Sequence, residues 1–155
     1  MINIRQTQRS IPFSATKYQK KAELILQHLG YGDFDLGIWL TTNATIQKYN
    51  HEYRNKNKPT DVLSFPYHTQ LKAGQKIKAQ SDEDKNIGDL IISVPYVFKN
   101  KQNLPGDFNA RMERMLVHGI CHLLGHDHIK DDEYKKMLTL ENKLLKILND
   151  HFKNS

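Results

Sequence analysis

The stretch that decides the fold is H-G-I-C-H-L-L-G-H-D-H, residues 118–128. His118 and His122 are four residues apart, so on a helix they lie one turn apart on the same face. Gly125 can end that helix in the left-handed conformation and turn the chain back toward His128. The spacing predicts that His118, His122 and His128 bind one metal ion, with His126 as the alternative third ligand.

Three imidazoles on a tetrahedral ion leave one coordination position open, which is the arrangement of a catalytic zinc site. We therefore expect one Zn²⁺ per chain. Cys121 precedes His122 by one residue and points about 100° away around the helix, so we expect it to be a packing residue. The other histidines are isolated along the chain and are expected to have no role at the metal: His28, His51, His68 and His151.

Working outward from this motif, hydrophobic periodicity predicts alternating strands and helices. Strands are expected near residues 2–6, 36–41, 62–65 and 87–92. Expected helices begin at Ser14, before Ile46, at Ser93 with Pro95 in the first turn, at Asp107 and at Asp131 or Asp132. Residues 67–86 are polar and show no period, so we expect a mobile, hairpin-like loop there.

Length and composition indicate an ordinary globular protein. A chain of 155 residues normally forms one domain, and 38% hydrophobic with 26% charged residues excludes a disordered chain or a coiled coil. The first residues lack the apolar core of a signal peptide, and no apolar run reaches the roughly 20 residues that span a bilayer. We expect one cytoplasmic domain over residues 1–155 that does not bind membranes. Its net charge of +6 would attract a phosphate backbone.

The histidine spacing is similar to that of the metzincin proteases, H-E-x-x-H-x-x-G-x-x-H. Gly119 stands where those proteases have the glutamate that serves as general base, and glycine cannot transfer a proton. The difference argues against peptidase chemistry. A glycine within a helix costs about 1 kcal/mol relative to alanine, so we expect backbone or substrate to approach closely at this position.

The chain as a whole resembles the YbeY family, whose motif H-G-x-x-H-L-x-G-x-D-H matches residues 118–128 throughout. The resemblance extends to N-A-T-I-Q-K-Y-N-H-E-Y-R at 43–54, T-D-V-L-S-F at 60–65 and G-D-L-I-I-S at 88–93. It implies a single α+β domain in which a four-stranded mixed, mostly parallel sheet packs against about five helices. One of these would be a metzincin-like metal helix that lines a basic groove.

The same resemblance implies an endoribonuclease for single-stranded RNA that acts in 16S rRNA 3′-end maturation and in quality control of the small ribosomal subunit. The 16S rRNA precursor and the small subunit would be its partners, with no DNA expected. The resemblance also implies zinc on His118, His122 and His128, and an important arginine at Arg54. We place Arg54 and His118 at the catalytic centre, where zinc would activate water or polarise the phosphate and Arg54 would pair with the scissile phosphate.

Other residues are assigned supporting roles. Lysines around 56–58 and 99–101 would contact the RNA backbone. Asp127 is expected to orient a histidine, and Asp89 to be a turn residue. The sequence contains no obvious aromatic platform for stacking bases.

Tyr49, Tyr53 and Phe65 are expected to lie in the core.

Two alternative functions remain. They are a noncatalytic ribosome assembly factor with a structural metal and a metalloprotease-like hydrolase. Gly119 counts against the protease, and an open fourth coordination position would count against a structural metal.

Overall fold

One four-stranded sheet organises the computed structural model, which describes residues 1–152. Its strands are β1 (Ile2–Gln6), β2 (Asp35–Thr41), β3 (Val62–Pro66) and β4 (Asn86–Ser93), in the order β1-β2-β4-β3. β1 and β2 pair in parallel, as do β2 and β4, whereas β3 runs antiparallel along the edge of β4. The predicted mixed, mostly parallel sheet is confirmed.

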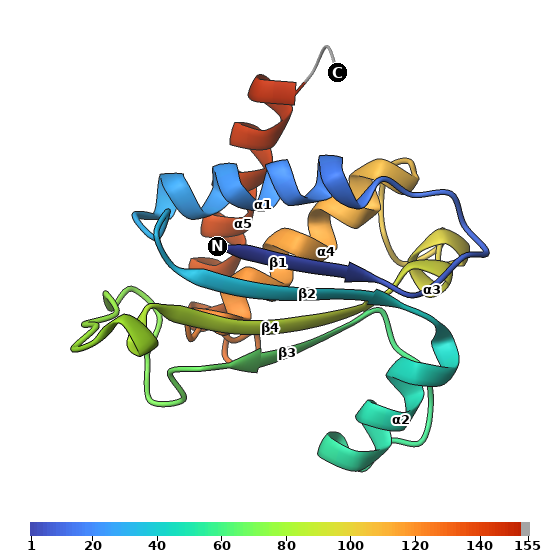
Figure 1. Cartoon of the computed structure of the whole chain (residues 1–155), viewed down its shortest axis with the longest axis horizontal. Coiled ribbons are helices and arrows are strands. Elements are labelled where there is room, and N and C mark those ends of the chain that lie inside the picture. The colour runs from blue at the N-terminus through green and yellow to red at the C-terminus, as the bar shows by residue number, and fades with distance from the viewer. Residues whose placement is uncertain (153–155) are drawn as a thin grey trace.

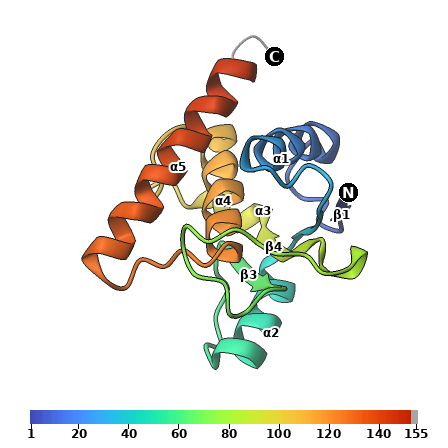
Figure 2. The ribbon, with the colours of Figure 1, turned by 90° about the vertical axis from the view of Figure 1, so that its left-hand side faces the viewer.

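Helices lie on both faces of this sheet, as Figures 1 and 2 show. α1 (Ala15–Leu29), α4 (Phe108–Leu123) and α5 (Asp131–Phe152) are on one side, and α2 (Asn43–Arg54) is on the other. The short α3 (Val94–Lys99) follows β4 directly. Within residues 1–152, no helix combines the length and apolar character needed to cross a bilayer.

Within residues 1–152, three of the four predicted helix caps are confirmed, and α2 is also capped although no cap was predicted for it. The side chains that accept a hydrogen bond from the first helical turn belong to Ser14, Thr42, Ser93 and Asp107. The expected aspartate cap of α5 is wrong, because Asp131 and Asp132 already lie in its first turn. There they still oppose the positive end of the helix dipole.

α4 is fixed in place by hydrogen bonds from buried side chains. Arg111 is only 4% exposed, and its guanidinium donates to the carbonyls of Val97, Phe98 and Gly106. The Tyr18 hydroxyl of α1 donates 2.8 Å to the carbonyl of Met112. Because these bonds satisfy groups that are buried from water, they hold the start of α4 against both α1 and α3.

The two faces of the sheet bury very different amounts of apolar surface. The main core lies under α1, α4 and α5, and receives Leu36, Ile38 and Leu90 from the central strands. On the opposite face, α2 contributes Ile46 to a small cluster with Leu63 and Ile91. Part of this second face therefore stays open to solvent.

The aromatic residues expected in the core lie at this second face instead. Tyr53 is 61% exposed, and Tyr49 and Phe65 are only half-buried. The buried residues of α2 are Ile46 and Asn50, so the helix packs through its first turns and leaves its last turn outside the core. The core assignment of Tyr53 is therefore wrong.

Residues 67–85 do not form the expected hairpin, because no strand pairing occurs among them. They contain one 3₁₀ turn, Asp82–Asp84, and cover the side of the main core with Leu71 and Ile77. The backbone N–H of Ile77 donates 3.1 Å to the Tyr31 hydroxyl. The carbonyl of Leu71 lies 2.4 Å from where a Cβ on Gly125 would stand, so this loop packs on the end of α4.

Replacing Gly125 should therefore be more costly than replacing another glycine with the same backbone conformation. Gly125 has φ 90° and Gly74 has φ 86°, but a Cβ on Gly74 meets nothing within 4 Å. Gly74→Ala should lower the free energy of unfolding by about 1–2 kcal/mol through left-handed strain alone. Gly125→Ala should lose about 1–3 kcal/mol more through overlap with Leu71. Urea unfolding of both variants measures the difference, and equal losses would contradict this packing.

Candidate metal centre and its cleft

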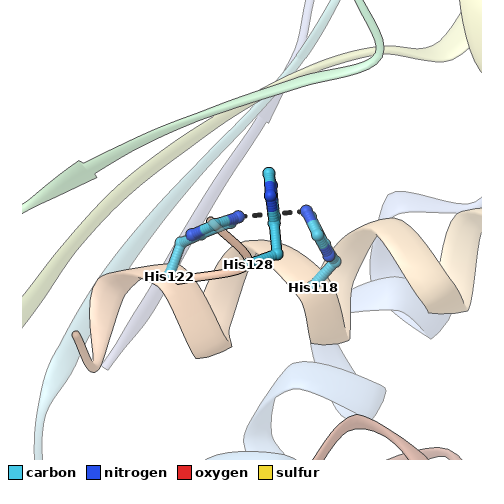
Figure 3. Close-up of side chains that lie close together, drawn as sticks. All are labelled: His118, His122 and His128. Atoms are coloured by element: carbon cyan, nitrogen blue, oxygen red, sulfur yellow. Dashed lines mark hydrogen bonds between the residues drawn. The ribbon is translucent and has the colours of Figure 1, made fainter. Parts of the chain in front are cut away.

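Three histidine side chains converge beyond the last turns of α4 (Figure 3). His118 and His122 project from the helix, and His128 comes back from the turn that follows it. One nitrogen from each of the three lies within 4.8 Å of the others, and Nε2 of His118 is 3.1 Å from Nε2 of His122. The structure thus brings together the three residues that the sequence predicts as metal ligands.

Hydrogen bonds at Nδ1 orient the rings of His118 and His122, so that Nε2 of each ring points toward the other histidines. Nδ1 of His118 lies 2.7 Å from a carboxylate oxygen of Glu141, and Nδ1 of His122 lies 2.9 Å from the carbonyl of His126. Both partners are acceptors, so each Nδ1 donates its proton outward. The inner Nε2 of each ring is then the atom that a metal would take as its ligand.

This arrangement fits a zinc ion. Nε2 of His118 and Nε2 of His122 lie 3.1 Å apart, close enough for both to contact one cation. A tetrahedral zinc with Zn–N bonds of about 2.0–2.1 Å would hold its nitrogens about 3.3 Å apart, close to the separation of the His118 and His122 nitrogens. His128 is exposed and can supply a third nitrogen from the solvent side. The donor set therefore suits a three-histidine metal centre.

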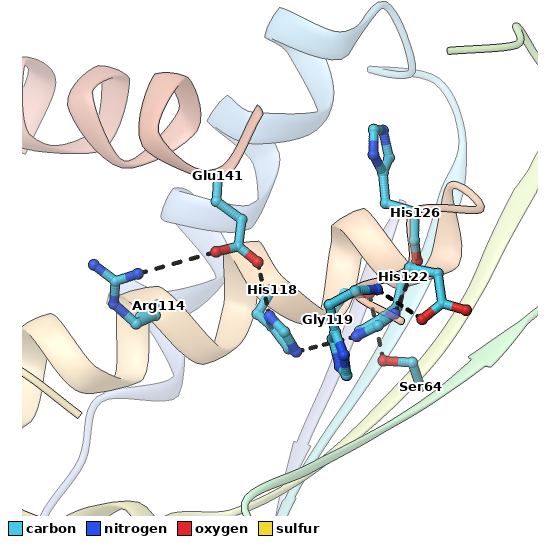
Figure 4. Close-up of polar contacts among 9 residues, drawn as sticks. Ser64, Arg114, His118, Gly119, His122, His126 and Glu141 are labelled. Atoms are coloured by element: carbon cyan, nitrogen blue, oxygen red, sulfur yellow. Dashed lines mark hydrogen bonds and ion pairs between the residues drawn. The ribbon is translucent and has the colours of Figure 1, made fainter. Parts of the chain in front are cut away.

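Glu141 is a functional candidate that sequence reasoning missed. It lies on α5, 23 residues from His118, and is one of the few buried charged residues, with 6% exposure. Nη1 of Arg114 lies 4.0 Å from its second oxygen, so the carboxylate joins Arg114 to His118 (Figure 4). The available signal was its place in the apolar stripe of the expected helix, four residues after Met137 and three before Leu144.

The neighbours of the triad take roles that differ from some expectations. The His126 ring points away from the other histidines, and only its carbonyl serves the site (Figure 4). Asp127 accepts a 2.7 Å hydrogen bond from the backbone N–H of His128, so it shapes the turn and contacts no ring nitrogen. Cys121 is fully buried in the main core, where burial raises the pKa of its thiol. It packs as expected.

Gly119 allows α4 to approach the sheet closely. A Cβ at this position would lie 2.7 Å from Cδ2 of Leu90 on β4. The carbonyl of Gly119 accepts a 3.4 Å hydrogen bond from the Ser64 hydroxyl of β3. The expected close approach at this glycine is thus one of backbone to sheet, and a side chain here would require Leu90 to shift.

A cleft of about 790 Å³ opens over the three histidines. Its walls come from β3, from the end of α2 and from the turn after α4, and they include Arg54, Tyr53 and Phe65. Arg54 is exposed and has no hydrogen bond or ion pair to any residue within 1–152, so its guanidinium is available to an anionic ligand. Lys56 and Lys58 are exposed but do not line the cleft. Of the basic residues expected to form a basic groove, Arg54 is therefore the one in the wall of this cleft.

His122 is held in the neutral form that binds metal. Burial, with a smaller contribution from His118, lowers its pKa from 6.5 to about 4. Between these pH values the unfolded chain binds a proton that folded, zinc-free protein does not bind. The folded state therefore loses stability as pH falls through this window.

We expect this effect in the zinc-free protein. The free energy of unfolding should fall from pH 6.5 toward pH 4, and it should fall less steeply in His122→Gln. Urea unfolding at several pH values compares the two proteins in the presence of a chelator. Identical pH dependence would show that His122 is not the group responsible.

Glu141 should tune zinc affinity through His118. Glu141→Gln removes the charge but keeps an acceptor for Nδ1, and loss of such an outer partner typically weakens metal binding about 10- to 100-fold. Competition with a chromogenic chelator measures the affinity. Glu113→Gln is the matched control, because Glu113 is a half-buried carboxylate of α4 that pairs with Lys21 at 2.8 Å. Equal zinc affinity in the two variants would contradict a role for Glu141.

Comparisons with known proteins identify the family of the chain. The family model described as Endoribonuclease YbeY matches residues 1–149. A human protein named Endoribonuclease YbeY is 41% identical over 143 residues, which cover 92% of this chain and 84% of that protein. A protein of the same name from Persephonella marina is 34% identical over 154 residues, which cover 98% of this chain and 94% of that protein.

The fold is also similar to a solved structure. The solution structure of TM1509 from Thermotoga maritima superposes with a TM-score of 0.64 and covers 99% of this chain and 92% of that one. At 23% identity this likeness concerns the fold alone. The family model and the two named relatives span most of the sequence, including the three histidines. The chain therefore belongs to the Endoribonuclease YbeY family.

Proposed function

We propose that residues 1–155 act as one zinc-dependent endoribonuclease domain in the cytoplasm. Its substrate is single-stranded RNA at the 3′ end of the 16S rRNA precursor, and it serves maturation and quality control of the small ribosomal subunit. The observation that carries the proposal is the convergence of three histidine nitrogens, with Nε2 of His118 and Nε2 of His122 3.1 Å apart, in a cleft that Arg54 also lines. The name shared by the relatives supplies the reaction class.

In this proposal His118, His122 and His128 hold the zinc. Bound zinc supplies a Lewis acid for the phosphate and lowers the pKa of bound water toward about 7. Glu141 and the His126 carbonyl keep the two helix histidines in the required tautomer and orientation. His118 is therefore both a ligand and the residue through which α5 affects the centre.

Arg54 is proposed to bind the scissile phosphate. It lies in the wall of the cleft that contains the three histidines, and its guanidinium has no internal partner within 1–152. A guanidinium can form two parallel hydrogen bonds to phosphate oxygens and stabilise charge that develops there. Lysines 56, 58, 99 and 101 would contact the RNA backbone farther from the cut.

The two alternatives have less support. The protease hypothesis lacks the general base at position 119, because Gly119 cannot transfer a proton. A structural metal would be enclosed by its ligands, whereas His128 is exposed and the histidines border a wide cleft. Thermal unfolding with and without chelator separates the readings, because a structural ion carries much of the folding free energy. We expect chelation to abolish cleavage with a small change in melting temperature.

The direct test is cleavage of a short RNA that carries the 16S 3′ junction. Zinc-loaded wild-type protein should cut it, and His122→Ala should lose the activity because one ligand is removed. Arg54→Ala should retain zinc and lower kcat by about 10²- to 10³-fold, as loss of a preorganised charge partner does. Gel analysis of the products measures the rates.

Matched controls distinguish these effects from misfolding. His28→Ala replaces an exposed histidine of α1, and Arg9→Ala replaces an exposed arginine remote from the cleft. Both should cut as wild type does, and circular dichroism should show that all variants are folded. Equal cleavage by wild type and His122→Ala would identify the activity as a contaminant and leave the assembly factor as the function to pursue.

A further inference from the structure

The open part of the second sheet face forms a shallow cavity of about 520 Å³. Strand register places two rows of side chains on this face. One row contains Asn3, Gly37, Asp89 and Phe65, and the next contains Arg5, Trp39, Ile91 and Leu63. α2 buries Ile91 and Leu63 through Ile46, and its tyrosines border the rest of this end. The remainder of the two rows is accessible from solvent.

Aromatic rings form a continuous series along the border of this cavity. Trp39 meets Tyr49 edge to face with centroids 5.6 Å apart, and the rings of Tyr49 and Tyr53 are parallel at 6.1 Å. Tyr53 meets Phe65 edge to face at 5.2 Å. We call Trp39, Tyr49, Tyr53 and Phe65 the aromatic series. It crosses from β2 over α2 to β3, and none of its members is fully buried.

The polar groups of the cavity suit the edges and faces of nucleobases. The guanidinium of Arg5 lies 4.6 Å from the centroid of the Trp39 ring, and Arg5 is exposed, so its outer face is open to a further planar group. The carboxylate of Asp89 occupies the space where a Cβ on Gly37 would stand. Asp89 is thus part of a strand and faces the cavity, which corrects its assignment as a turn residue. A carboxylate there can accept from an exocyclic amino group.

The cavity borders the cleft over the histidines. Tyr53 and Phe65 line both, and Arg54 follows Tyr53 in the wall of the cleft. A single strand whose phosphate contacts Arg54 therefore has its neighbouring base within reach of Tyr53, the residue that precedes Arg54. An RNA duplex does not, because its bases are stacked on one another and unavailable to protein rings.

We propose that the aromatic series and Arg5 form a base-stacking platform that binds the single-stranded RNA on one side of the cleavage point. The proposal rests on the endoribonuclease function proposed above and adds the element that positions the strand. Exposed aromatic rings and guanidinium planes on a four-stranded sheet are features of single-strand recognition. An apolar protein segment would not favour a surface that carries Arg5, Asn3 and Asp89 among its rings, and the net charge of +6 favours a polyanion.

Trp39 provides a direct probe, because it is the one tryptophan of the chain. The protein is kept in chelator so that no cleavage occurs, and is titrated with a short single-stranded oligoadenylate. Fluorescence anisotropy of labelled RNA reports binding, and tryptophan emission reports whether bases reach the platform. We expect saturable quenching that parallels the anisotropy, and much weaker binding of a duplex of adenylate and uridylate strands.

Variants of exposed residues test the platform without disturbing the core. Tyr53→Leu and Arg5→Gln should each weaken binding of the oligoadenylate by about 5- to 150-fold, the loss typical of one stacked base. Tyr53→Phe should bind as wild type does, because it keeps the ring. Phe98→Leu is the control, since Phe98 is 39% exposed on α3 and packs against Phe108 on the other side of the sheet.

The outcomes separate this proposal from the function on which it rests. Quenching with weakened binding in Tyr53→Leu supports the platform even if zinc-loaded wild type cuts no RNA, in which case only the proposed function fails. Cleavage by wild type together with unchanged RNA affinity in both Tyr53→Leu and Arg5→Gln overturns the platform and leaves the function standing. Unchanged RNA affinity with weaker binding to purified small-subunit proteins also overturns it, in favour of a protein partner.

Discussion

The contact between α4 and the sheet at Gly119 is the constraint on which the rest of the site depends. Because this residue has no side chain, the helix backbone approaches Leu90 more closely than a Cβ would allow, and its carbonyl reaches the Ser64 hydroxyl. Together with the hydrogen bonds of Arg111 and Tyr18, that contact holds α4 against the sheet. With its apolar stripe held against the main core, the face that carries His118 and His122 is directed toward the edge strand β3 and the cleft.

The electrostatics of the centre follow from which elements reach this face. α5 brings a carboxylate to one imidazole, and the turn after α4 brings a carbonyl to the other. Both hydrogen bonds keep protons on the outer nitrogens, so the inner nitrogens can act as metal ligands. Burial lowers the pKa of His122 to about 4, which keeps that ring neutral at physiological pH. The centre is therefore prepared for a cation by the protein itself.

The two faces of the sheet have different roles, because one carries the main core and the other carries residues that border the cleft. The face under α1, α4 and α5 holds nearly all of the buried apolar side chains, whereas the face under α2 buries only a small cluster. α2 packs through its first turns and leaves its last turn, with Tyr53 and Arg54, beside the cleft. Residues that contribute little to the core can then contact a ligand, and substitutions there should affect binding more than folding.

The sequence by itself determined the strands, most helix caps and the three histidines, because hydrophobic period, capping and the i, i+4 spacing are local properties of the chain. Only the tertiary structure decided which side chains from distant parts of the chain contact these elements and which stay exposed. Glu141 meets His118 across 23 residues, Asp89 turns into an open cavity, and Tyr53 lies outside the core, because each depends on how two distant elements pack. Periodicity specifies which side of a helix or strand is apolar, but the partner that meets the other side is set by the assembled fold.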